Sequence, residues 1–440
     1  MSAQILKTWE QHLAHFRQVV GGFADSRTGD NLSYSMEDFG LGAFSVFFTQ
    51  CPSFLASQKA MQRAKGRSNA QSLFHIEDIP CHSQIRNMLD PVPPEKLFAC
   101  YDAAFQSLYE SGQLESWRTL ADKLLITLDG TWYYSSQKIH CPNCSSLEHQ
   151  NGDTTYYHSA ITPVIVAPGH EHAIPLRPEF ITPQDGHTKQ DCEIAAGKRW
   201  LEKNSAQYAP LRAILLGDDI YAHQPFCRRT RLHGFDFIFV CKPDSHTTLY
   251  NWVNLLQRPD LGCVTERVKV GAHFHTYTYH YAHDVPLAEG QDALKVNWCE
   301  LTVTDHEGNA VYHNGWITNL RITDQNVAAI VAAGRARWKI ENENNNTLKT
   351  KGYHLEHNFS HGQKHLSSLL AAMNILAFLY HTFLSFTDEH YRLIRATLPT
   401  RQTFFDDLRA LTRYLLFATW DALMDFMMRG LEIGPYAKPT

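Results

Sequence analysis

The chain has 440 residues, of which 44% are hydrophobic and 19% are charged, and its formal net charge is −5. This length suggests two or three domains, and the hydrophobic share argues against global disorder. The charge gives no whole-chain support for a nucleic-acid partner, although a local basic face would still be compatible with one. The ten cysteines follow no regular disulfide framework, and the N-terminus lacks a charged start followed by an apolar run. We therefore expect a reduced, cytoplasmic protein.

Residues 1–118 are predicted to form a mostly helical region. Apolar residues recur at helical spacing in three stretches, namely 6–20, 36–50 and 94–112. The polar, turn-rich stretch 63–72 between them is expected to be a loop. Its basic residues would be solvated charges or, on a sharper interpretation, phosphate contacts; they are Arg63, Lys65 and Arg67.

From residue 119 the pattern changes to alternating strands and helices. Five strand-like stretches and two helix-like stretches follow each other; the strands are 123–136, 156–169, 173–181, 211–219 and 233–242, and the helices are 187–204 and 245–257. This order predicts an α/β core with a mixed sheet flanked by helices, of which 119–258 is the first part.

The rest of the chain is predicted to interrupt and then complete this core. Residues 259–322 are β-rich and are expected to form a separate small sheet inserted before a helix at 335–349. The core would resume over 323–386, and 387–440 would form a helical tail. The apolar stretch 369–386 approaches the length of a membrane span, but its Asn374 and His381 favour a buried helix, so we expect no membrane partner.

Three acidic residues lie where sheet proteins build active sites. Asp129 lies in the first core strand, Asp218 ends a later strand, and Glu341 lies on the predicted helix, four residues after Arg337 and four before Asn345. Side chains at that spacing look out from one side of a helix. Each acid alone has a structural explanation, as a turn, a cap or a surface residue. Together they would be costly to bury unpaired, and divalent cations are their natural counter-charge.

The order of these motifs resembles a DDE transposase with a ribonuclease-H-like core, of the bacterial insertion-sequence group whose third motif reads Tyr-x2-Arg-x3-Glu-x6-Lys. The matching residues are Asp129 in TLDGTWY, Asp218 in LLGDDIY, and Arg337 and Glu341 in RARWKIENENNNTLK. Asp218 fits better than its neighbour Asp219, because an aromatic residue follows it by three. The chain departs from the motif at two places: Gly334 stands at the Tyr position and Leu348 at the Lys position, with Lys349 one residue late.

The resemblance implies a bacterial, nucleoid-associated enzyme that cuts DNA at transposon ends and transfers the strands to a target. Asp129, Asp218 and Glu341 would hold two Mg²⁺ or Mn²⁺ ions, water would attack the phosphodiester, and the freed 3′-hydroxyl would attack target DNA. Arg337 and Lys349 would contact phosphates, and two copies would assemble on DNA. Two alternatives stay open: a ribonuclease-H-like nuclease without strand transfer, and a transposase-derived DNA-binding protein that no longer cuts.

Further residues are candidates for DNA contact. The family's insertion carries a Trp that stacks on a flipped base, for which Trp298 and Trp316 are candidates, although a strand Trp is more often part of a core. Arg228 and Arg229 belong to the densest basic run, ten residues after Asp218, and suit the DNA backbone. The chain has no phosphate-binding loop and no dinucleotide fingerprint, so we expect no nucleotide cofactor.

A Cys-x2-Cys pair, Cys141 and Cys144, follows the first core strand. Two thiolates at this spacing can chelate zinc, but a structural site needs four ligands. The residues considered for completing it are His149, His158, Cys192 and the pair His170 and His172. A hairpin turn with reduced thiols is the favoured interpretation. A separate series, His354, His357, His361 and His365, is expected to make polar contacts near the active site or with phosphates.

Overall fold

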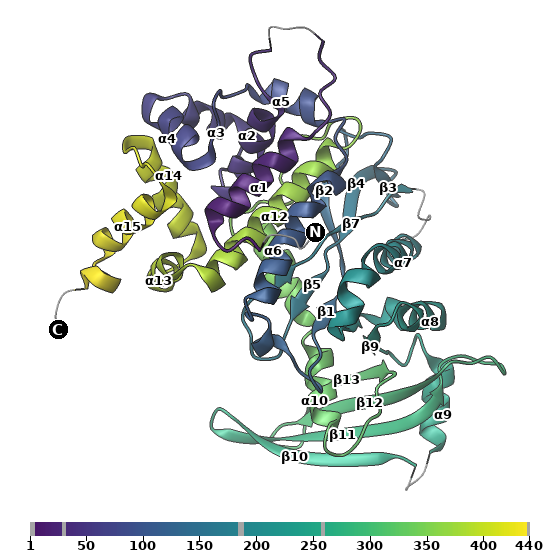
Figure 1. The fold of residues 1–440 in the computed structure, drawn as a ribbon. Helices are drawn as coiled ribbons and strands as arrows, with labels where there is room; N and C mark the ends of the chain where they lie inside the picture. The colour runs from purple at the N-terminus through teal and green to yellow at the C-terminus, as the bar shows by residue number, and fades with distance from the viewer. Residues whose placement is uncertain (1–4, 29–31, 184–188, 257–259, 438–440) are drawn as a thin grey trace.

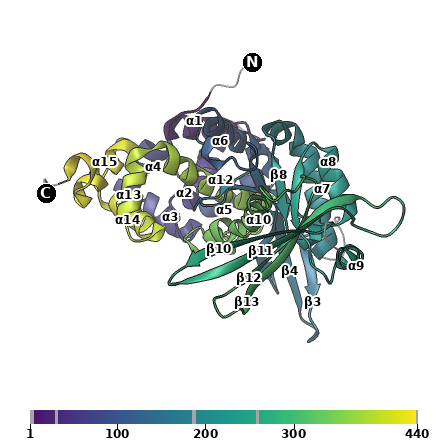
Figure 2. The ribbon, with the colours of Figure 1, turned by 90° about the horizontal axis from the view of Figure 1, so that it is seen from below.

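The two ends of the chain build a helical body, and its middle builds a large twisted sheet (Figure 1). The computed structural model describes residues 5–28, 32–183, 189–256 and 260–437. Seen from below, the helical body lies to one side, while the sheet and the helices α7 to α9 lie to the other (Figure 2).

The helical body combines N-terminal and C-terminal segments around one buried helix. The N-terminal helices are α1 (Trp9–Gly21), α2 (Met36–Phe48), α3 (Phe54–Met61), α4 (Ala64–Phe74), α5 (His82–Leu89) and α6 (Phe98–Glu110). The C-terminal helices are α12 (Leu366–Thr387), α13 (Glu389–Thr397), α14 (Arg401–Tyr414) and α15 (Trp420–Leu431). Helix α12 is long and apolar enough to span a membrane, but 89% of its most apolar window is buried inside the protein. It packs on α2 and α6, as a core helix does.

The stretch 63–72 is helical, which corrects the predicted loop. It forms most of α4, and its three cations are exposed, as expected of solvated charges. Asn69 explains the difference, because its side-chain amide donates hydrogen bonds of 2.7 Å to the backbone oxygens of Thr412 and Leu415 in the C-terminal region. Contacts with residues more than 340 positions away in the sequence therefore stabilise this helix although its local helix preference is weak.

The sheet core contains four strands that run in one direction and one, β5, that runs opposite to them. Strands β1 (Leu125–Thr127), β8 (Ile214–Gly217) and β9 (Asp236–Val240) are parallel neighbours, β5 (Val164–Val166) pairs antiparallel with β1, and β6 (Ile174–Pro175) pairs antiparallel with β5, in the order β9-β8-β1-β5-β6. The strands are short, apolar and largely buried. Helices α7 (Lys189–Tyr208) and α8 (Gln224–Leu232) pack on one face, and α10 (Val327–Arg335) packs on the other.

The first core strand is split at Asp129. Before this residue the chain is β1 of the large sheet; after it the chain is β2 (Gly130–Ser136), which belongs to a second sheet with β3 (Ser145–Glu148), β4 (Thr154–Ile161) and β7 (Glu179–Phe180). The partner strand splits opposite, between β4 and β5, where the Thr162 amide still donates to the Asp129 carbonyl at 3.1 Å. Asp129 therefore lies where the two sheets diverge.

The inserted strands continue the core sheet, which corrects the prediction of a separate small sheet. They are β10 (Gly262–Val270), β11 (His273–Pro286), β12 (Lys295–Thr304) and β13 (Ala310–Thr318), all antiparallel. Strand β13 pairs with β9, for example Ile317 with Phe239, and so makes one nine-stranded sheet. This pairing satisfies backbone groups that an open β9 edge would leave unpaired. Helix α9 (Thr247–Leu255) packs against β11.

Candidate active site

Asp129 is the centre of a group of charged residues that come from separate elements. Its Oδ2 accepts a hydrogen bond of 3.2 Å from the Asn345 side chain. Burial is the largest of the effects that raise the pKa of Asp129 to about 7. The carboxylates of Glu193, Asp218 and Glu341 contribute to the same rise, while the Arg337 guanidinium opposes it. A carboxyl group in this position binds a proton or a cation near neutral pH.

Asp218 and Asp219 follow β8 directly but have different partners. Burial raises the pKa of Asp218, Arg337 opposes that rise, and one Asp218 oxygen accepts from the Ile220 amide at 3.1 Å, as a helix cap does. Asp219 accepts from the Lys242 amide at 2.7 Å and lies 3.3 Å from the His246 ring. Burial would raise the pKa of Asp219, but these hydrogen bonds lower it overall. The Asp218 carboxylate is among the charges that raise the pKa of Asp129.

The third motif lies on an interrupted helix. Helix α10 ends at Arg335, a turn follows at Arg337, the segment Ile340–Asn345 is π-helical, and α11 (Asn346–Thr350) completes it. Within this stretch Asn345 is buried, Arg337 is half-buried and Glu341 is exposed, so the three side chains do not share one environment. π-Helical turns often occur at functional sites.

Neighbouring side chains of the same stretch differ strongly in exposure. Ile340 is fully buried, but the Trp338 ring is 46% exposed and Lys339 lies over it.

Glu193 is a fourth acid of the site, which the sequence alone did not single out. It lies on α7, is buried, and its Oε1 accepts from the Gly130 amide at 3.1 Å and from the Tyr221 hydroxyl at 2.9 Å. Its position early in a helix has a sufficient structural explanation in the helix dipole, so only the tertiary structure reveals its proximity to Asp129.

The carboxylates are near one another without forming a closed cage. Within the described part of the chain, these acids do not form a preassembled group of three or more metal ligands. An ion held here would be completed by water or phosphate oxygens, as is usual for Mg²⁺. A buried carboxyl whose pKa is raised by other carboxylates fits such a cation.

The basic residues predicted to contact DNA have protein partners here. Lys349 pairs with Glu356 at 2.7 Å. The exposed Arg228 donates to the Asp292 carbonyl, and Arg229 pairs with Glu202. Two of these partners are surface carboxylates and the third is a backbone oxygen. A DNA phosphate could therefore replace each of them as the partner of the basic side chain at little cost in free energy.

Trp298 is not available for base stacking in this structure, which corrects that prediction. Its ring is only 2% exposed and packs edge-on against Tyr250, and Trp316 is fully buried. Both rings belong to the sheet core, as strand tryptophans commonly do.

The cysteine pair and one member of the histidine series come together elsewhere. Cys141, Cys144, His158 and His361 form a compact cluster of ligand atoms. His158 was one of the residues considered from the sequence as a further ligand for the cysteine pair. His361 was not considered for that role, because it lies more than 200 residues from the cysteines in the sequence.

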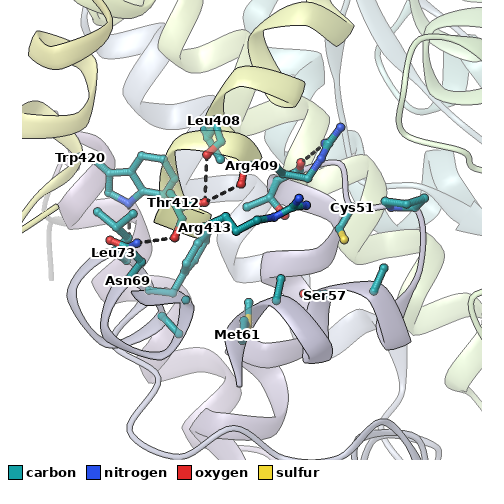
Figure 3. Close-up of a pocket in the computed structure, with 17 residues that line it drawn as sticks. Cys51, Ser57, Met61, Asn69, Leu73, Leu408, Arg409, Thr412, Arg413 and Trp420 are labelled. Atoms are coloured by element: carbon teal, nitrogen blue, oxygen red, sulfur yellow. Dashed lines mark hydrogen bonds between the residues drawn. The ribbon is translucent and has the colours of Figure 1, made fainter. Parts of the chain in front are cut away.

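A cavity of about 280 Å³ lies far from the acids, in the helical body (Figure 3). Helices α3, α4 and α14 line it, with Arg409 and Arg413 on one side and the Trp420 ring at its edge. Arg409 donates to the backbone oxygens of Thr49 and Gln50, which makes it a structural link between the two ends of the chain.

No family model and no curated protein matches this chain. Among solved structures, it is similar to the cryo-EM structure of the piggyBac transposase synaptic complex with hairpin DNA, with a TM-score of 0.37 and 10% sequence identity. The match covers 99% of this chain and 89% of that chain. At this distance the likeness supports no functional inference, so the inferences below depend on the residues themselves.

Proposed function

We propose that this protein is a metal-dependent DNA transposase of the DDE class, which cleaves DNA at transposon ends and joins the freed strands to a target. The observation that supports this most is the electrostatic state of Asp129. Burial and three neighbouring carboxylates raise its pKa to about 7. The ionised form of Asp129 is therefore unfavourable unless a cation binds beside it.

The strand order supports a ribonuclease-H-like core. In the order β9-β8-β1-β5-β6, the central strand is β1, the first of these strands in the chain. On one side β5 runs antiparallel to β1 and β6 antiparallel to β5; on the other side β8 and β9 run parallel to β1. This arrangement places Asp129 beside the end of β8, where Asp218 follows. Carboxylates at the carboxyl ends of neighbouring parallel strands meet at one edge of a sheet.

Asp129, Asp218 and Glu341 are the residues that would hold two Mg²⁺ or Mn²⁺ ions. Bound there, the ions would activate the attacking oxygen and stabilise the leaving one in a phosphodiester displacement. Asn345 orients the Asp129 carboxylate by its hydrogen bond, and the Arg337 guanidinium favours the ionised form of both aspartates. Glu341 is exposed, so it is the acid most accessible to a DNA backbone.

DNA would reach this site across the basic residues near the ends of β8 and the π-helical segment. Arg228, Arg229 and Lys349 would exchange their present surface partners for phosphates. Because two transposon ends must be joined, the active form is proposed to be a dimer assembled on DNA.

The test uses a labelled fragment that carries the DNA flanking this chain's own coding region, together with a supercoiled target. With Mg²⁺ or Mn²⁺, the wild type is expected to nick the fragment and then join the labelled 3′-hydroxyl end to the target. Asp129→Asn, Asp218→Asn and Glu341→Gln are expected to bind the fragment without cutting it. Glu343→Gln is the matched control, because this acid lies on the same π-helical segment but is not one of the three proposed metal ligands.

The products separate the competing functions. Cleavage without joined product would favour a ribonuclease-H-like nuclease. Binding without cleavage, with a metal affinity that does not change in the three variants, would favour a DNA-binding protein descended from a transposase. Full cleavage by Asp129→Asn would refute the proposed site.

A further inference from the structure

Two cysteines and two histidines from distant segments point their ligand atoms at one spot. Cys141 and Cys144 lie on the connection between β2 and β3, which both pair with β4; His158 lies on β4, and His361 lies in the segment that connects α11 to α12. All four ligand atoms lie within 4.8 Å of one another. Cys141, His158 and His361 are buried, and Cys144 is half-buried.

The distances between the ligand atoms match the edges of a zinc tetrahedron. With Zn–S bonds of about 2.3 Å and Zn–N bonds of about 2.05 Å, the edges are about 3.8 Å between sulfurs, about 3.6 Å between sulfur and nitrogen, and about 3.3 Å between nitrogens. The Sγ atoms of Cys141 and Cys144 are 4.0 Å apart. His158 Nε2 lies 3.6 and 3.5 Å from these sulfurs. His361 Nε2 lies 3.3 Å from Cys144 Sγ and 3.1 Å from His158 Nε2.

The surroundings of the four residues hold them in a ligating arrangement. The Cys141 backbone amide donates a hydrogen bond to Cys144 Sγ at 3.4 Å, so the N–H group points at that sulfur. His361 Nδ1 lies 3.2 Å from the Gly362 carbonyl, which as acceptor fixes the proton on Nδ1 and leaves the Nε2 lone pair for a metal. A plain hairpin with reduced thiols would need none of these contacts.

The segment that carries His361 is itself built into place. Gly362 has a φ of +69°, and a Cβ there would meet an Asp90 oxygen at 2.2 Å, so this position requires glycine. Asp90 accepts from the amides of Gln363, Lys364 and Leu366 at 3.0–3.2 Å. The β2–β3 connection is joined to the same segment directly, because the Asn143 side chain donates to the Lys364 carbonyl at 2.8 Å.

We propose that Cys141, Cys144, His158 and His361 bind one structural Zn²⁺ ion. Bound as thiolates, the two cysteines cancel the charge of the ion, and the two histidines bind as neutral rings, so the site has no net charge to bury. All four positions are taken by protein, as in structural rather than catalytic zinc sites. The ion would link the β2–β3 connection and β4 to the segment that follows the Glu341 helix.

This proposal is independent of the transposase assignment, because none of the four ligands belongs to the carboxylate site. The Asp129→Asn variant should therefore retain its zinc. A protein that cuts no DNA at all could still confirm the zinc site.

The experiment measures metal in the full chain, purified from zinc-supplemented medium and passed through metal-free buffer. Elemental analysis is expected to find one zinc per chain, and X-ray absorption is expected to show two sulfur and two nitrogen ligands. Replacing zinc by Co²⁺ should give the intense visible bands of tetrahedral cobalt with thiolate charge transfer. Chelation of the zinc should lower the melting temperature reversibly.

Two ligand variants and one control complete the test. Cys144→Ser and His361→Gln are expected to lose the zinc, while Cys263→Ser, which removes an exposed thiol on β10, should keep it. Wild-type protein without zinc that also gives no thiolate–cobalt bands would overturn the proposal. Zinc bound without sulfur ligands would do the same, as would full retention of zinc in both ligand variants. If the variants are insoluble, the absorption spectra of the wild type alone decide.

Discussion

The Asn345 side chain donates a hydrogen bond to the Asp129 carboxylate although the two residues are 216 positions apart in the sequence. The same amide group is fixed from its other end, because Asn345 Oδ1 accepts from the Thr162 hydroxyl and from Asn344 Nδ2, each at 2.9 Å. The π-helical segment is thereby attached to the point where the two sheets diverge.

Asn345→Ala should raise the pKa of Asp129, because it removes a donor that favours the ionised carboxylate. Buried partners left unpaired also cost about 1–3 kcal/mol each, so stability should fall. In the proposed cleavage assay, the loss of activity should be greater at neutral pH than at more alkaline pH, where Asp129 is ionised in both proteins. Asn346→Ala, at an exposed neighbouring position, is the control. A pH–rate profile with the same shape in both variants would contradict this role.

Asp129→Asn should make the metal-free protein more stable near pH 8. The folded-state pKa of about 7 lies above the ordinary value of 3.8, so the stability that the protonated group contributes is complete below about pH 4 and is lost as the pH rises through 7. The wild type should lose about 1.4 kcal/mol per pH unit between pH 5 and 7 through this group, and the variant should not.

Unfolding of both Asp129 proteins by urea, without added Mg²⁺ or Mn²⁺, measures this difference. Because both retain the cysteine–histidine cluster, its contribution cancels. If the two proteins have the same free energy of unfolding at pH 8, the ionised Asp129 carboxylate does not destabilise the folded state, which contradicts the prediction.

Glu193→Gln should lower the pKa of Asp129, since Glu193 is the neighbouring charge that raises it most. The glutamine oxygen can still accept from Gly130 and Tyr221, so the change removes charge while keeping these two contacts. The acidic limb of Mn²⁺ binding, measured by calorimetry at several pH values, should move to lower pH. Glu343→Gln should leave that limb in place; an equal shift in both variants would indicate a general effect of net charge.

Gly334→Ala should destabilise the protein by about 1–3 kcal/mol, as overpacking does. A Cβ at Gly334 would meet Nε1 of Trp316 at 2.7 Å and Ile238 at 3.1 Å. Gly430→Ala is the matched control: it is also a helical glycine, nothing lies within 4 Å of its Cβ, and alanine should stabilise the helix slightly. Thermal unfolding compares the melting temperatures of the two variants. Equal melting temperatures would show that the Trp316 ring can move to make room for the new Cβ without destabilising the protein.

The same contact explains a departure from the transposase motif. The motif has tyrosine where this chain has Gly334, and the Trp316 ring of the inserted strand β13 occupies the space beside that position. The fully buried Trp316 thus fills a core position, and a larger side chain at 334 would collide with it. The sequence shows the glycine, but only the packing shows why it is there.

The sequence by itself determined where most strands and helices form, because these depend on local periodicity. Strand β1, the strand before Asp218 and the buried helix α12 all lie where the pattern of apolar residues predicted them. Local pattern also placed Asp218 directly after its strand, but it did not reveal that the first core strand splits at Asp129 or that Glu341 lies on a π-helical segment.

The tertiary structure alone decided which side chains meet. Glu193 and Asn345 lie beside Asp129 because β1, α7 and the π-helical segment converge where the sheets diverge. His361 completes the cysteine cluster, and β13 pairs with β9, across long stretches of intervening chain. Such contacts depend on the order of the strands in the sheet and on which helices cover its faces. They cannot be predicted from the local sequence around either partner.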